Sequence, residues 1–393
     1  MTMISLDLIH LYTYNMKLYN SCRCCGNKEL TKWLSLPPSP VANALFIEPN
    51  FVRYKLDLNY CAKCGHLQLA GAPDPDGVFS EYRYKSGVSN SFQKHFTAYA
   101  STVNELFSKP GSVLEIGSND GYLLSKFKEL GWNVIGVEPS EYLIEEHANK
   151  GVDVITGFFN TELVKEKSWE NKFNLICANN VLAHIPDMLD VVQGIEQSLT
   201  PNGVLIVECG NQSGILSGEY LDNVYHEHID YYSPYSFSTL LSRVGLIVEN
   251  VDVINTHGIS FRITARKKAG NSTVEFQPVD IALKLKQVTD SIANRKIKMK
   301  AMINNRPFIA YGAAAKAVTA LYTLGLVDNN LTGVVDDNDL KQNCYFPGTD
   351  ILITSPEVMD KNALVVITAW NVYEDIKRKL VDRGHTGEIL CLQ

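Results

Sequence analysis

Two short cysteine clusters tie distant parts of this chain to one point. The first is CRCCG, from Cys22 to Gly26, and the second is CAKCG, from Cys61 to Gly65. In each, the two residues of Cys-x-x-Cys let both sulfurs face one point, and the glycine permits the tight turn behind them. Four thiolates suit a closed tetrahedral site, so we expect a structural zinc ion that contributes folding free energy. A redox pair or surface thiols are the alternatives. Cys24 is the cysteine of the first cluster that is not needed as a ligand. The expected ligands are Cys22, Cys25, Cys61 and Cys64.

The remaining composition is that of an ordinary globular protein with two or three domains. The chain has 393 residues, of which 45% are hydrophobic and 20% charged. A net charge of −7 argues against a nucleic-acid or membrane-surface partner, and no apolar run approaches the ~18 residues of a membrane span. Residues 1–20 show neither the charged segment nor the cleavage site of a signal peptide. We therefore expect an N-terminal extension and a cytoplasmic location, where cysteines stay reduced.

The segment Ser112–Glu138 has the pattern of a βαβ unit. A short apolar strand, Val113–Ile116, runs into a turn from Gly117 to Gly121, and a helix and a second strand, 133–138, follow. In such a doubly wound fold the ligand lies beyond the C-terminal ends of the strands, over the glycine turn. The sequence therefore predicts a ligand site at this turn.

The acidic residues of the turn, EIGSNDG, indicate which ligand fits. A dinucleotide site favours Gly-x-Gly-x-x-Gly, whose small residues admit a pyrophosphate. Glu115 and Asp120 would repel a pyrophosphate and suit a cationic amino-acid ligand. The turn resembles the Glu-x-Gly-x-Gly-x-Gly signature of S-adenosylmethionine-dependent methyltransferases, with Asn119 in place of the middle glycine. An NAD site and a Rossmann-like fold with a vacant cofactor cleft are the alternatives.

Further segments follow in the order of this resemblance. Glu138 ends the second strand, where it can accept both ribose hydroxyls, and TGFF (156–159) can flank an adenine. NNVLAHIP (179–186) follows a third strand, FNLICA, as the post-strand motif of these methyltransferases does. The expected cofactor-binding residues are Glu115, Gly117, Asn119, Asp120, Gly121, Glu138, Pro139, Phe158, Asn179 and Asn180.

The last third of the chain indicates a second, smaller α/β unit after a long polar helix, Ile281–Asn304. The turn Gly312–Lys316 has small residues and a lysine, so it suits a phosphate better than the first turn does. Lys316 and Lys341 are candidates for binding a diphosphate, and Trp370 either covers a base or packs in a core. The expected substrate residues here are Lys316, Asp336, Lys341, Trp370 and Asn371.

The order of these parts resembles the sugar C-methyltransferases of nucleotide-linked deoxysugar pathways. The matching pieces are CRCCG with CAKCG, EIGSNDG, NNVLAHIP, YHEHIDYYS, THGISFR and YGAAAKA…DDNDLKQN…AWN. The resemblance implies methylation of carbon 3 of a nucleotide-linked 4-keto-6-deoxyhexose, with S-adenosylmethionine as cofactor and a structural zinc ion. It also implies an α/β chain, and the self-contained three-part layout of this chain favours a monomer. The parts are an N-terminal extension 1–20, a zinc-binding domain 21–80, a Rossmann-like class I methyltransferase domain 81–270, a helical connector 271–304 and a smaller Rossmann-like nucleotide-sugar-binding domain 305–393.

The resemblance assigns catalysis chiefly to the stretch DNVYHEHIDYYS. It implies that His228 is the catalytic base and that Glu227 and Tyr225 orient the substrate. It also carries over His184 and Tyr84, with Tyr82 as the near alternative to Tyr84. Two residues of THGISFR line the sugar site or a strand edge, namely His257 and Arg262.

This residue set suits a reaction at carbon. Methyl transfer to carbon needs a carbanion, and a neighbouring ketone makes the C–H proton removable by a base of near-neutral pKa such as histidine. Tyr225, Tyr84 or His184 can donate to the enolate oxygen. A metal ion at His226 and His228 is disfavoured, because no Asp, Glu or His elsewhere has a clear partner spacing. A buried tyrosine-rich strand, with His226 structural, is the main competitor.

Other functions stay open on the sequence alone. The chain can be an O- or N-methyltransferase acting on another small metabolite, which needs no carbon-acid base. It can also be a zinc-stabilised nucleotide-binding module without catalysis. An NAD-linked sugar epimerase or dehydrogenase is disfavoured, because EIGSNDG lacks the chemistry of a phosphate site.

Overall fold

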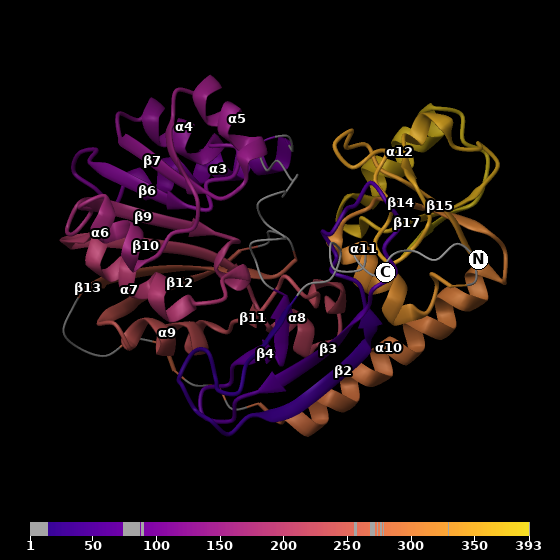
Figure 1. Cartoon of the computed structure of the whole chain (residues 1–393), viewed down its shortest axis with the longest axis horizontal. Coiled ribbons are helices and arrows are strands. Elements are labelled where there is room, and N and C mark those ends of the chain that lie inside the picture. The colour runs from indigo at the N-terminus through magenta and orange to yellow at the C-terminus, as the bar shows by residue number, and fades with distance from the viewer. Residues whose placement is uncertain are drawn as a thin grey trace.

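The computed structural model of the chain describes residues 15–73, 87, 90–254, 258–267, 272, 274, 275, 277, 279–328 and 330–392. Figure 1 shows two α/β lobes standing on a smaller antiparallel sheet, with a long helix along the lower edge. Among the described residues, none of the helices combines the length and the apolar composition that spanning a bilayer requires.

The larger lobe contains a seven-stranded sheet with the order β12-β13-β10-β9-β6-β7-β8. The five parallel strands are β6 (Ser112–Ile116), β7 (Asn133–Glu138), β8 (Asp153–Thr156), β9 (Phe173–Asn179) and β10 (Leu199–Gly210). β13 (Ser260–Lys267) runs antiparallel to both β10 and β12 (Leu246–Ile254). The central strands are apolar on both faces because helices cover both.

Alternate residues of these strands enter two separate cores. Val113 packs with α3 (Asn90–Asn104) and α4 (Tyr122–Glu129) on one face. Its neighbour Leu114 packs with helices of the other face, and that core also contains the cysteine knuckles. The helices of this second face are α6 (Thr161–Glu166), α7 (Met188–Ser198) and α9 (Pro234–Ser242), while α5 (Ile144–Asn149) follows β7.

The small antiparallel sheet has the strand order β11-β4-β3-β2. Its strands are β2 (Thr31–Ser39), β3 (Tyr54–Tyr60), β4 (Leu67–Leu69) and β11 (Asp230–Tyr231). β11 comes from the middle of the chain, inside the range 81–270 expected to form the methyltransferase domain. A separate pair, β1 (Met16–Leu18) with β5 (Gly71–Pro73), shows that the end of the expected extension is part of the fold.

The stretch YHEH does not form the strand considered from the sequence. Residues 225–227 form a turn, and only Asp230 and Tyr231 pair with β4. His226 and His228 therefore do not share the face of a strand, which removes the geometry that a two-histidine metal site there requires.

The C-terminal lobe has a five-stranded parallel sheet with the order β16-β15-β14-β17-β18. Its strands are β14 (Phe308–Tyr311), β15 (Leu331–Val335), β16 (Ile353–Thr354), β17 (Leu364–Ile367) and β18 (Ile389–Cys391), and its helices are α11 (Ala315–Leu324) and α12 (Tyr373–Asp382). The connector helix α10 (Ile281–Ile303) precedes them, and its side chains at Val288, Met299 and Ile303 are buried.

Short helices supply several turns around the sites. They are η3 (Glu141–Leu143), η4 (Leu182–His184), α8 (Ser213–Leu216), η5 (Leu221–Asn223), η6 (Pro356–Val358) and η7 (Trp370–Val372).

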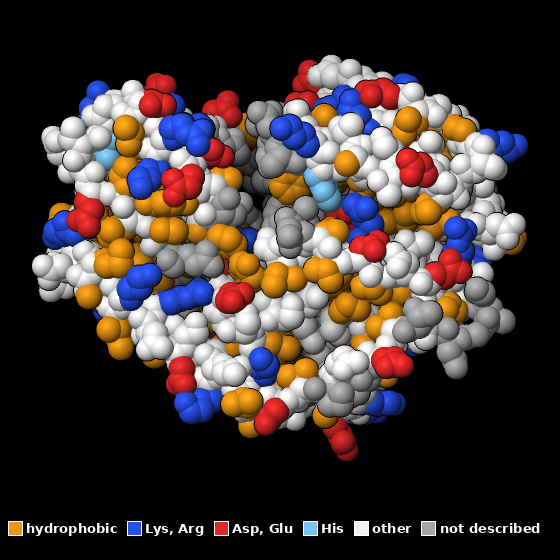
Figure 2. Space-filling view, turned by 180° about the vertical axis from the view of Figure 1, so that it is seen from behind, with side chains coloured by type: hydrophobic (Ala, Val, Ile, Leu, Met, Phe, Trp, Pro, Cys, Tyr) orange, Lys and Arg blue, Asp and Glu red, His pale blue; other side chains and the backbone are white. Residues whose placement is uncertain are grey.

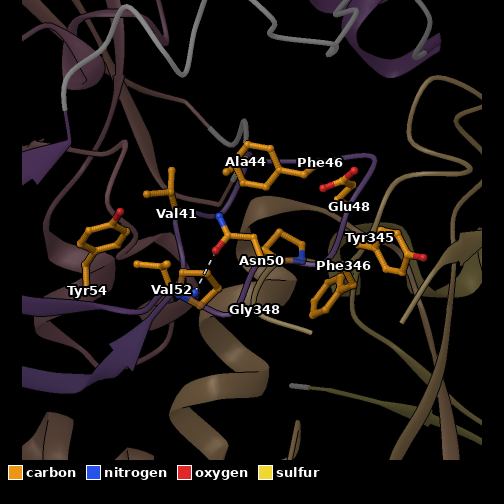
Figure 3. Close-up of a pocket in the computed structure, with 12 residues that line it drawn as sticks. Val41, Ala44, Phe46, Glu48, Asn50, Val52, Tyr54, Tyr345, Phe346 and Gly348 are labelled. Atoms are coloured by element: carbon orange, nitrogen blue, oxygen red, sulfur yellow. Dashed lines mark hydrogen bonds between the residues drawn. The ribbon is translucent and has the colours of Figure 1, made fainter. Parts of the chain in front are cut away.

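The loop between β2 and β3 connects the small sheet to the C-terminal lobe. Phe46 forms a β-bridge with Tyr345, and a pocket beside it is lined by Val41, Tyr54 and Phe346 among others (Figure 3). Viewed from behind, the two lobes are separated by a hollow near the upper edge, and acidic and basic side chains intermingle on both (Figure 2).

Candidate active site

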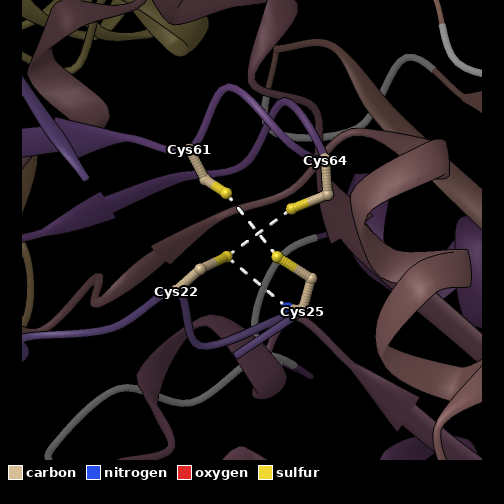
Figure 4. A group of neighbouring side chains, drawn as sticks. All are labelled: Cys22, Cys25, Cys61 and Cys64. Carbon is tan, nitrogen blue, oxygen red and sulfur yellow. Dashed lines mark hydrogen bonds between the residues drawn. The ribbon is translucent and has the colours of Figure 1, made fainter. Parts of the chain in front are cut away.

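Four cysteine sulfurs converge where the two knuckles meet (Figure 4). All four lie within 4.8 Å of one another and belong to Cys22, Cys25, Cys61 and Cys64. The Sγ atoms of Cys22 and Cys64 are 3.5 Å apart, and those of Cys25 and Cys61 are 3.6 Å apart. A tetrahedral zinc ion with Zn–S bonds of about 2.3 Å separates its sulfurs by about 3.8 Å. The cysteines therefore fit zinc.

Both knuckles close in the same way. The amide of Gly26 donates to the carbonyl of Cys22 at 2.8 Å, and the amide of Gly65 donates to that of Cys61 at 2.8 Å. The glycines have φ of 74° and 70°, in the left-handed region that glycine adopts without strain. Cys24 lies outside the group, and burial raises the pKa of its thiol well above the usual value.

Arg23, inside the first knuckle, lies against a buried carboxylate of β11. Its Nε lies 2.9 and 3.0 Å from the two carboxylate oxygens of Asp230. His66 Nε2 lies 2.9 Å from Oδ1, and the hydroxyl of Tyr232 donates to Oδ2 at 3.1 Å. Burial alone would raise the pKa of Asp230, but Arg23 and His66 outweigh it and hold that pKa below its usual value.

The glycine turn after β6 is shaped by close packing. Gly117 has φ of 66°, and a Cβ there would lie 2.6 Å from Val181 Cγ2. Gly121 has φ of 71°, and a Cβ there would lie 2.9 Å from His147 Cδ2. Asn119, which replaces the middle glycine of the signature, also has a positive φ of 50°, which asparagine tolerates better than most residues.

Buried polar atoms without partners lie at the C-terminal edge of β6 and β9. Within the described residues, Glu115 Oε2 and both amide atoms of Asn179 are buried and make no hydrogen bond. Burial raises the pKa of Glu115 well above its usual value, and the nearby carboxylate of Asp120 adds to this. A bound cation would offset both the burial of Glu115 and the repulsion from Asp120, and would thus stabilise the charged form of Glu115. The site therefore suits a ligand with an ammonium group.

Glu138 ends β7 beside the same turn. Its carboxylate accepts the amide N–H of Asn119 at 2.8 Å and that of Ser140 at 2.9 Å. Burial raises the pKa of Glu138 to about 7, although these two N–H groups act in the opposite direction. Pro139 follows it directly, and Phe158 is 43% exposed after β8, as a residue that covers a flat ring would be.

Asn180, the next expected cofactor residue, has φ of 55° and donates its amide to the carbonyl of Glu208 at 2.8 Å.

Tyr225 and His228 form an acid–base pair after η5. His228 Nδ1 lies 2.8 Å from the carbonyl of Asn223. Because a carbonyl only accepts, Nδ1 carries the proton, and Nε2 then accepts from the hydroxyl of Tyr225 at 2.6 Å. The two rings stack with centroids 3.9 Å apart. The pair thus places a proton acceptor beside a proton donor.

His184, on η4, brings a second imidazole to this pair. Its ring centroid is 4.6 Å from that of His228, and its Nδ1 donates to the carbonyl of Glu227 at 2.7 Å. Burial lowers the pKa of His184 to about 4. The ring is therefore neutral at pH 7, and its Nδ1 proton is already used.

Glu227 and His226 face the loop between β2 and β3. The carboxylate of Glu227 accepts the amide N–H of Asn43 at 2.6 Å and that of Ala42 at 3.3 Å, and burial raises its pKa. His226 Nε2 lies 3.2 Å from the carbonyl of Lys55, and burial lowers the pKa of His226 to about 4. Both side chains thus bind backbone groups of the small domain.

A second cluster lies where η5 meets the C-terminal lobe. Trp370 Nε1 donates to Asp222 Oδ2 at 2.6 Å, and its ring stacks on Tyr220 with centroids 5.3 Å apart. Lys316 Nζ lies 5.5 Å from the centre of the Trp370 ring. Burial lowers the pKa of Lys316, although Asp222 favours its charged form. Trp370 is thus a half-buried residue between two parts of the chain, not a core residue.

Lys341 and Asp336 bind each other beside the Gly-Ala turn. Lys341 Nζ donates to the carbonyl of Ala313 at 3.0 Å and lies 3.4 Å from Asp336 Oδ2. The same oxygen of Asp336 accepts the amide of Ala313 at 2.7 Å. These contacts hold the turn together, so Lys316 is better placed than Lys341 to meet a phosphate.

Arg262 lies on β13 against a buried carboxylate of β10. It donates through Nε to Glu208 at 2.7 Å, also contacts it through Nη2, and stacks over Tyr99. The other oxygen of Glu208 is 2.8 Å from His95 Nε2. Three expected site residues, Tyr84 with its alternative Tyr82, and His257, lie outside the described residues, as does the side chain of Asn371.

Three family models match successive parts of the chain. "Putative zinc binding domain" matches residues 22–79, "Methyltransferase domain" matches 92–251, and "C-methyltransferase C-terminal domain" matches 280–391. C-methyltransferase NovU of Streptomyces niveus is 27% identical over 384 residues, which is 91% of this chain and 91% of the relative. The chain is therefore a methyltransferase that is similar to a C-methyltransferase along most of its length.

Other relatives resemble only the middle of this methyltransferase. A ubiquinone biosynthesis O-methyltransferase of Rhodopseudomonas palustris (strain TIE-1) is 27% identical over 149 residues, 35% of this chain and 58% of the relative. Among solved structures, PH0226 from Pyrococcus horikoshii OT3 matches 47% of this chain and 95% of its own, with a TM-score of 0.40 and 15% identity.

The expected cofactors fit this methyltransferase. Zinc has its closed set of four thiolates, inside the matched zinc-binding segment. S-adenosylmethionine carries an ammonium group, which can donate hydrogen bonds to Glu115 and Asn179. It also carries two ribose hydroxyls, whose hydrogen bonds the carboxylate of Glu138 can accept. The expected three-part α/β fold is likewise confirmed.

Several residues at the site had no signal in the sequence. Arg23 is one of the two residues between the cysteines of the first knuckle, and Asp230 follows the YHEH motif, 207 positions away. Asp222 was quoted only as the start of a stretch, and Glu208 and His95 lie outside any recognised motif. A continuous apolar strand interrupted by a charge, as at Glu208 in β10, is the signal that could have found one of them.

Proposed function

We propose that this methyltransferase is a C-methyltransferase that adds a methyl group to carbon 3 of a nucleotide-linked 4-keto-6-deoxyhexose. The observation that carries the proposal is the Tyr225–His228 pair. Transfer to oxygen or nitrogen uses an existing lone pair, whereas transfer to carbon first requires a proton to leave a C–H bond. A histidine whose tautomer is fixed by the carbonyl of Asn223, with a tyrosine hydroxyl at its other nitrogen, suits that requirement.

In this proposal His228 removes the proton. Its Nδ1–H stays bonded to the Asn223 carbonyl, so only Nε2 is available as the base. The sugar replaces the Tyr225 hydroxyl at Nε2, and that hydroxyl turns to donate to the enolate oxygen at carbon 4. The positive charge that develops on His228 is stabilised by the Asn223 carbonyl.

The remaining residues position the reactants. S-adenosylmethionine supplies an electrophilic methyl group when bound. Glu115, Asn179 and Glu138 fix its position at the edge of the seven-stranded sheet, so that the methyl group meets the carbon in line. Glu227 and His184 hold the turn that carries His228, because both bind backbone groups of neighbouring segments.

The nucleotide is proposed to bind to the C-terminal lobe. Lys316 stands at the start of α11, where the positive end of the helix dipole favours an anion. Trp370 and Tyr220 offer a stacked aromatic pair next to it. This cluster adjoins η5, which leads directly to His228, so the sugar can extend from the phosphates toward the base.

Mass spectrometry in deuterated buffer tests the proposal. The substrates are dTDP- and GDP-linked 4-keto-6-deoxyhexoses, incubated with and without S-adenosylmethionine. We expect gain of one methyl group with the cofactor, and exchange of the carbon 3 proton for deuterium without it. His228→Asn should lower both rates by about 10²- to 10⁴-fold, while S-adenosylhomocysteine affinity in calorimetry stays unchanged. Full activity of His228→Asn would refute the role of this base.

An O-methyltransferase is the second candidate, favoured by the similarity of the central part to ubiquinone O-methyltransferases. In that case no deuterium enters carbon 3, and His228→Asn keeps most of its activity. The position of the transferred methyl group, read from fragment masses, separates the two candidates.

A further inference from the structure

The side chain of Arg23 extends from the first cysteine knuckle and contacts residues of the methyltransferase domain. Its position between the ligands Cys22 and Cys25 fixes its backbone to the metal site. Its side chain is 8% exposed, and it donates through Nη1 to the carbonyl of Pro186 at 2.7 Å and through Nη2 to that of Ile185 at 2.5 Å. The guanidinium thus binds two consecutive carbonyls of the loop that follows β9.

The same guanidinium holds the segment that carries the base. Its Nε is bonded to Asp230, which lies two residues after His228. The loop bound by Nη1 and Nη2 carries His184, two residues before Pro186. One side chain therefore joins the two segments whose imidazoles lie 4.6 Å apart.

The surroundings leave this junction little freedom. The side chain of Asp230 is 0% exposed, and His66 and Tyr232 occupy its oxygens together with Arg23. The two segments are also bonded directly, because the amide of Ile229 donates to the carbonyl of Ala183 at 2.7 Å. Both oxygens of the buried Asp230 carboxylate therefore have partners, which favours one geometry.

We propose that Arg23 is a positioning residue that sets the distance between the His184 loop and His228, so that the zinc knuckle acts as a template for the active site. The inference rests on the proposed role of His228 as the base. It assigns the N-terminal zinc domain a task in catalysis beyond its own folding. A salt bridge that only stabilises the fold would affect stability and leave the turnover of the folded enzyme unchanged.

Arg23→Lys is the informative variant. Lysine keeps a positive charge beside Asp230 but cannot bind two carbonyls and a carboxylate with one planar group. Arg23→Ala would leave Asp230 without its cation in the interior, and it can simply fail to fold. Arg243→Met is the matched control, because Arg243 also binds the first knuckle, at the Cys24 carbonyl (2.9 Å), but from the C-cap of α9. Its described contacts include neither the His184 loop nor Asp230.

Five measurements are made on the zinc-loaded full chain. They are kcat and KM with the 4-keto sugar nucleotides, affinity for S-adenosylhomocysteine, zinc content, melting temperature, and hydrogen exchange of peptides covering 182–186 and 226–231. For Arg23→Lys we expect kcat to fall about 10- to 100-fold, since displacements of about 1 Å have such effects. Its zinc content and S-adenosylhomocysteine affinity should be unchanged, and both peptides should exchange faster. Arg243→Met should keep kcat within about two-fold of the parent, the scatter expected of a change away from the reacting groups.

Two results would overturn the inference. One is normal kcat and normal exchange in Arg23→Lys. The other is an equal loss of kcat in Arg23→Lys and Arg243→Met that follows a lowered melting temperature, which would make the contact merely structural. Failure of the proposed function appears separately, as activity that persists in His228→Asn, and the exchange measurement still tests the coupling of the two segments.

Discussion

The hydroxyl of Tyr225 lies 2.6 Å from Nε2 of His228, and the two rings stack with centroids 3.9 Å apart. Tyr225→Phe keeps the stacking and removes only the hydroxyl. We expect kcat to fall about 10²-fold, the usual cost of losing one donor to a developing oxyanion, with little change in S-adenosylhomocysteine affinity. Steady-state kinetics and calorimetry measure the two effects.

Tyr231→Phe is the control for this prediction. Tyr231 lies near the same imidazole, at a ring distance of 6.4 Å from His228, and its buried hydroxyl interacts with the backbone of Tyr225. This variant should retain kcat. A loss as large as that of Tyr225→Phe would show that the tyrosine cluster matters only for packing.

The raised pKa of Glu138 predicts that cofactor affinity depends on pH. Its raised pKa, about 7 instead of 4.5, means that the folded protein without ligand holds this proton more tightly than the unfolded chain does. Glu138 therefore destabilises the fold progressively as pH rises from 4.5 through 7. The ribose hydroxyls need the carboxylate form, so affinity for S-adenosylhomocysteine should fall by at most about 8-fold from pH 7.5 to pH 6.

Glu138→Gln provides the comparison, because an amide does not titrate in this range. The variant should bind more weakly at pH 7.5 and show no such dependence on pH. Equal slopes for the parent and the variant, followed by calorimetry, would assign the titration to another group.

Lys316 should contribute to binding of the nucleotide part of the substrate. Lys316→Met removes the ammonium at the start of α11, and we expect KM for the sugar nucleotide to rise about 10-fold, as for loss of one charge-assisted contact, while kcat changes little. Lys379→Met serves as the control, because Lys379 lies on α12 with its side chain 55% exposed and bound to Asp337. Equal KM values for the two variants would argue against a phosphate at Lys316.

Loss of zinc should disturb more than the small domain. The ligands Cys22, Cys61 and Cys64 belong to the same buried cluster as β9 and α7. Cys25→Ser should therefore release the metal and lower the free energy of unfolding by more than about 3 kcal/mol. Metal analysis and thermal denaturation measure this. Cys24→Ala should retain one zinc per chain, since Cys24 is not a ligand.

Local patterns predicted the parts of the fold that depend on neighbours in sequence. The strand expected at 133–138 is β7, the third strand is β9 with one more residue, and the polar connector is α10, which ends at Ile303. The zinc ligands were also predictable, because the spacing inside each knuckle dictates where both sulfurs point. The same holds for the position of Glu138 at the end of β7.

Local sequence patterns could not predict the contacts between segments that are far apart in the chain. Nothing local distinguishes the carboxylate that Arg23 binds, since its partner Asp230 is 207 positions away. The stretch around His226 has the aromatic composition of a strand, yet it forms a turn because Glu227 and His226 bind backbone groups of the loop between β2 and β3. Arg262 was expected near the sugar, and its partners Glu208 and His95 come from two other elements.

The pairing of β11 with β4 also has a consequence for synthesis of the chain on the ribosome. The outermost strand of the small antiparallel sheet is Asp230–Tyr231, which is translated long after β2, β3 and β4. Domains generally fold in order from the N-terminus as they emerge. Here the small antiparallel sheet keeps one edge unpaired until most of the methyltransferase domain has been translated. An N-terminal fragment that stops before Asp230 therefore lacks the strand that closes its own sheet.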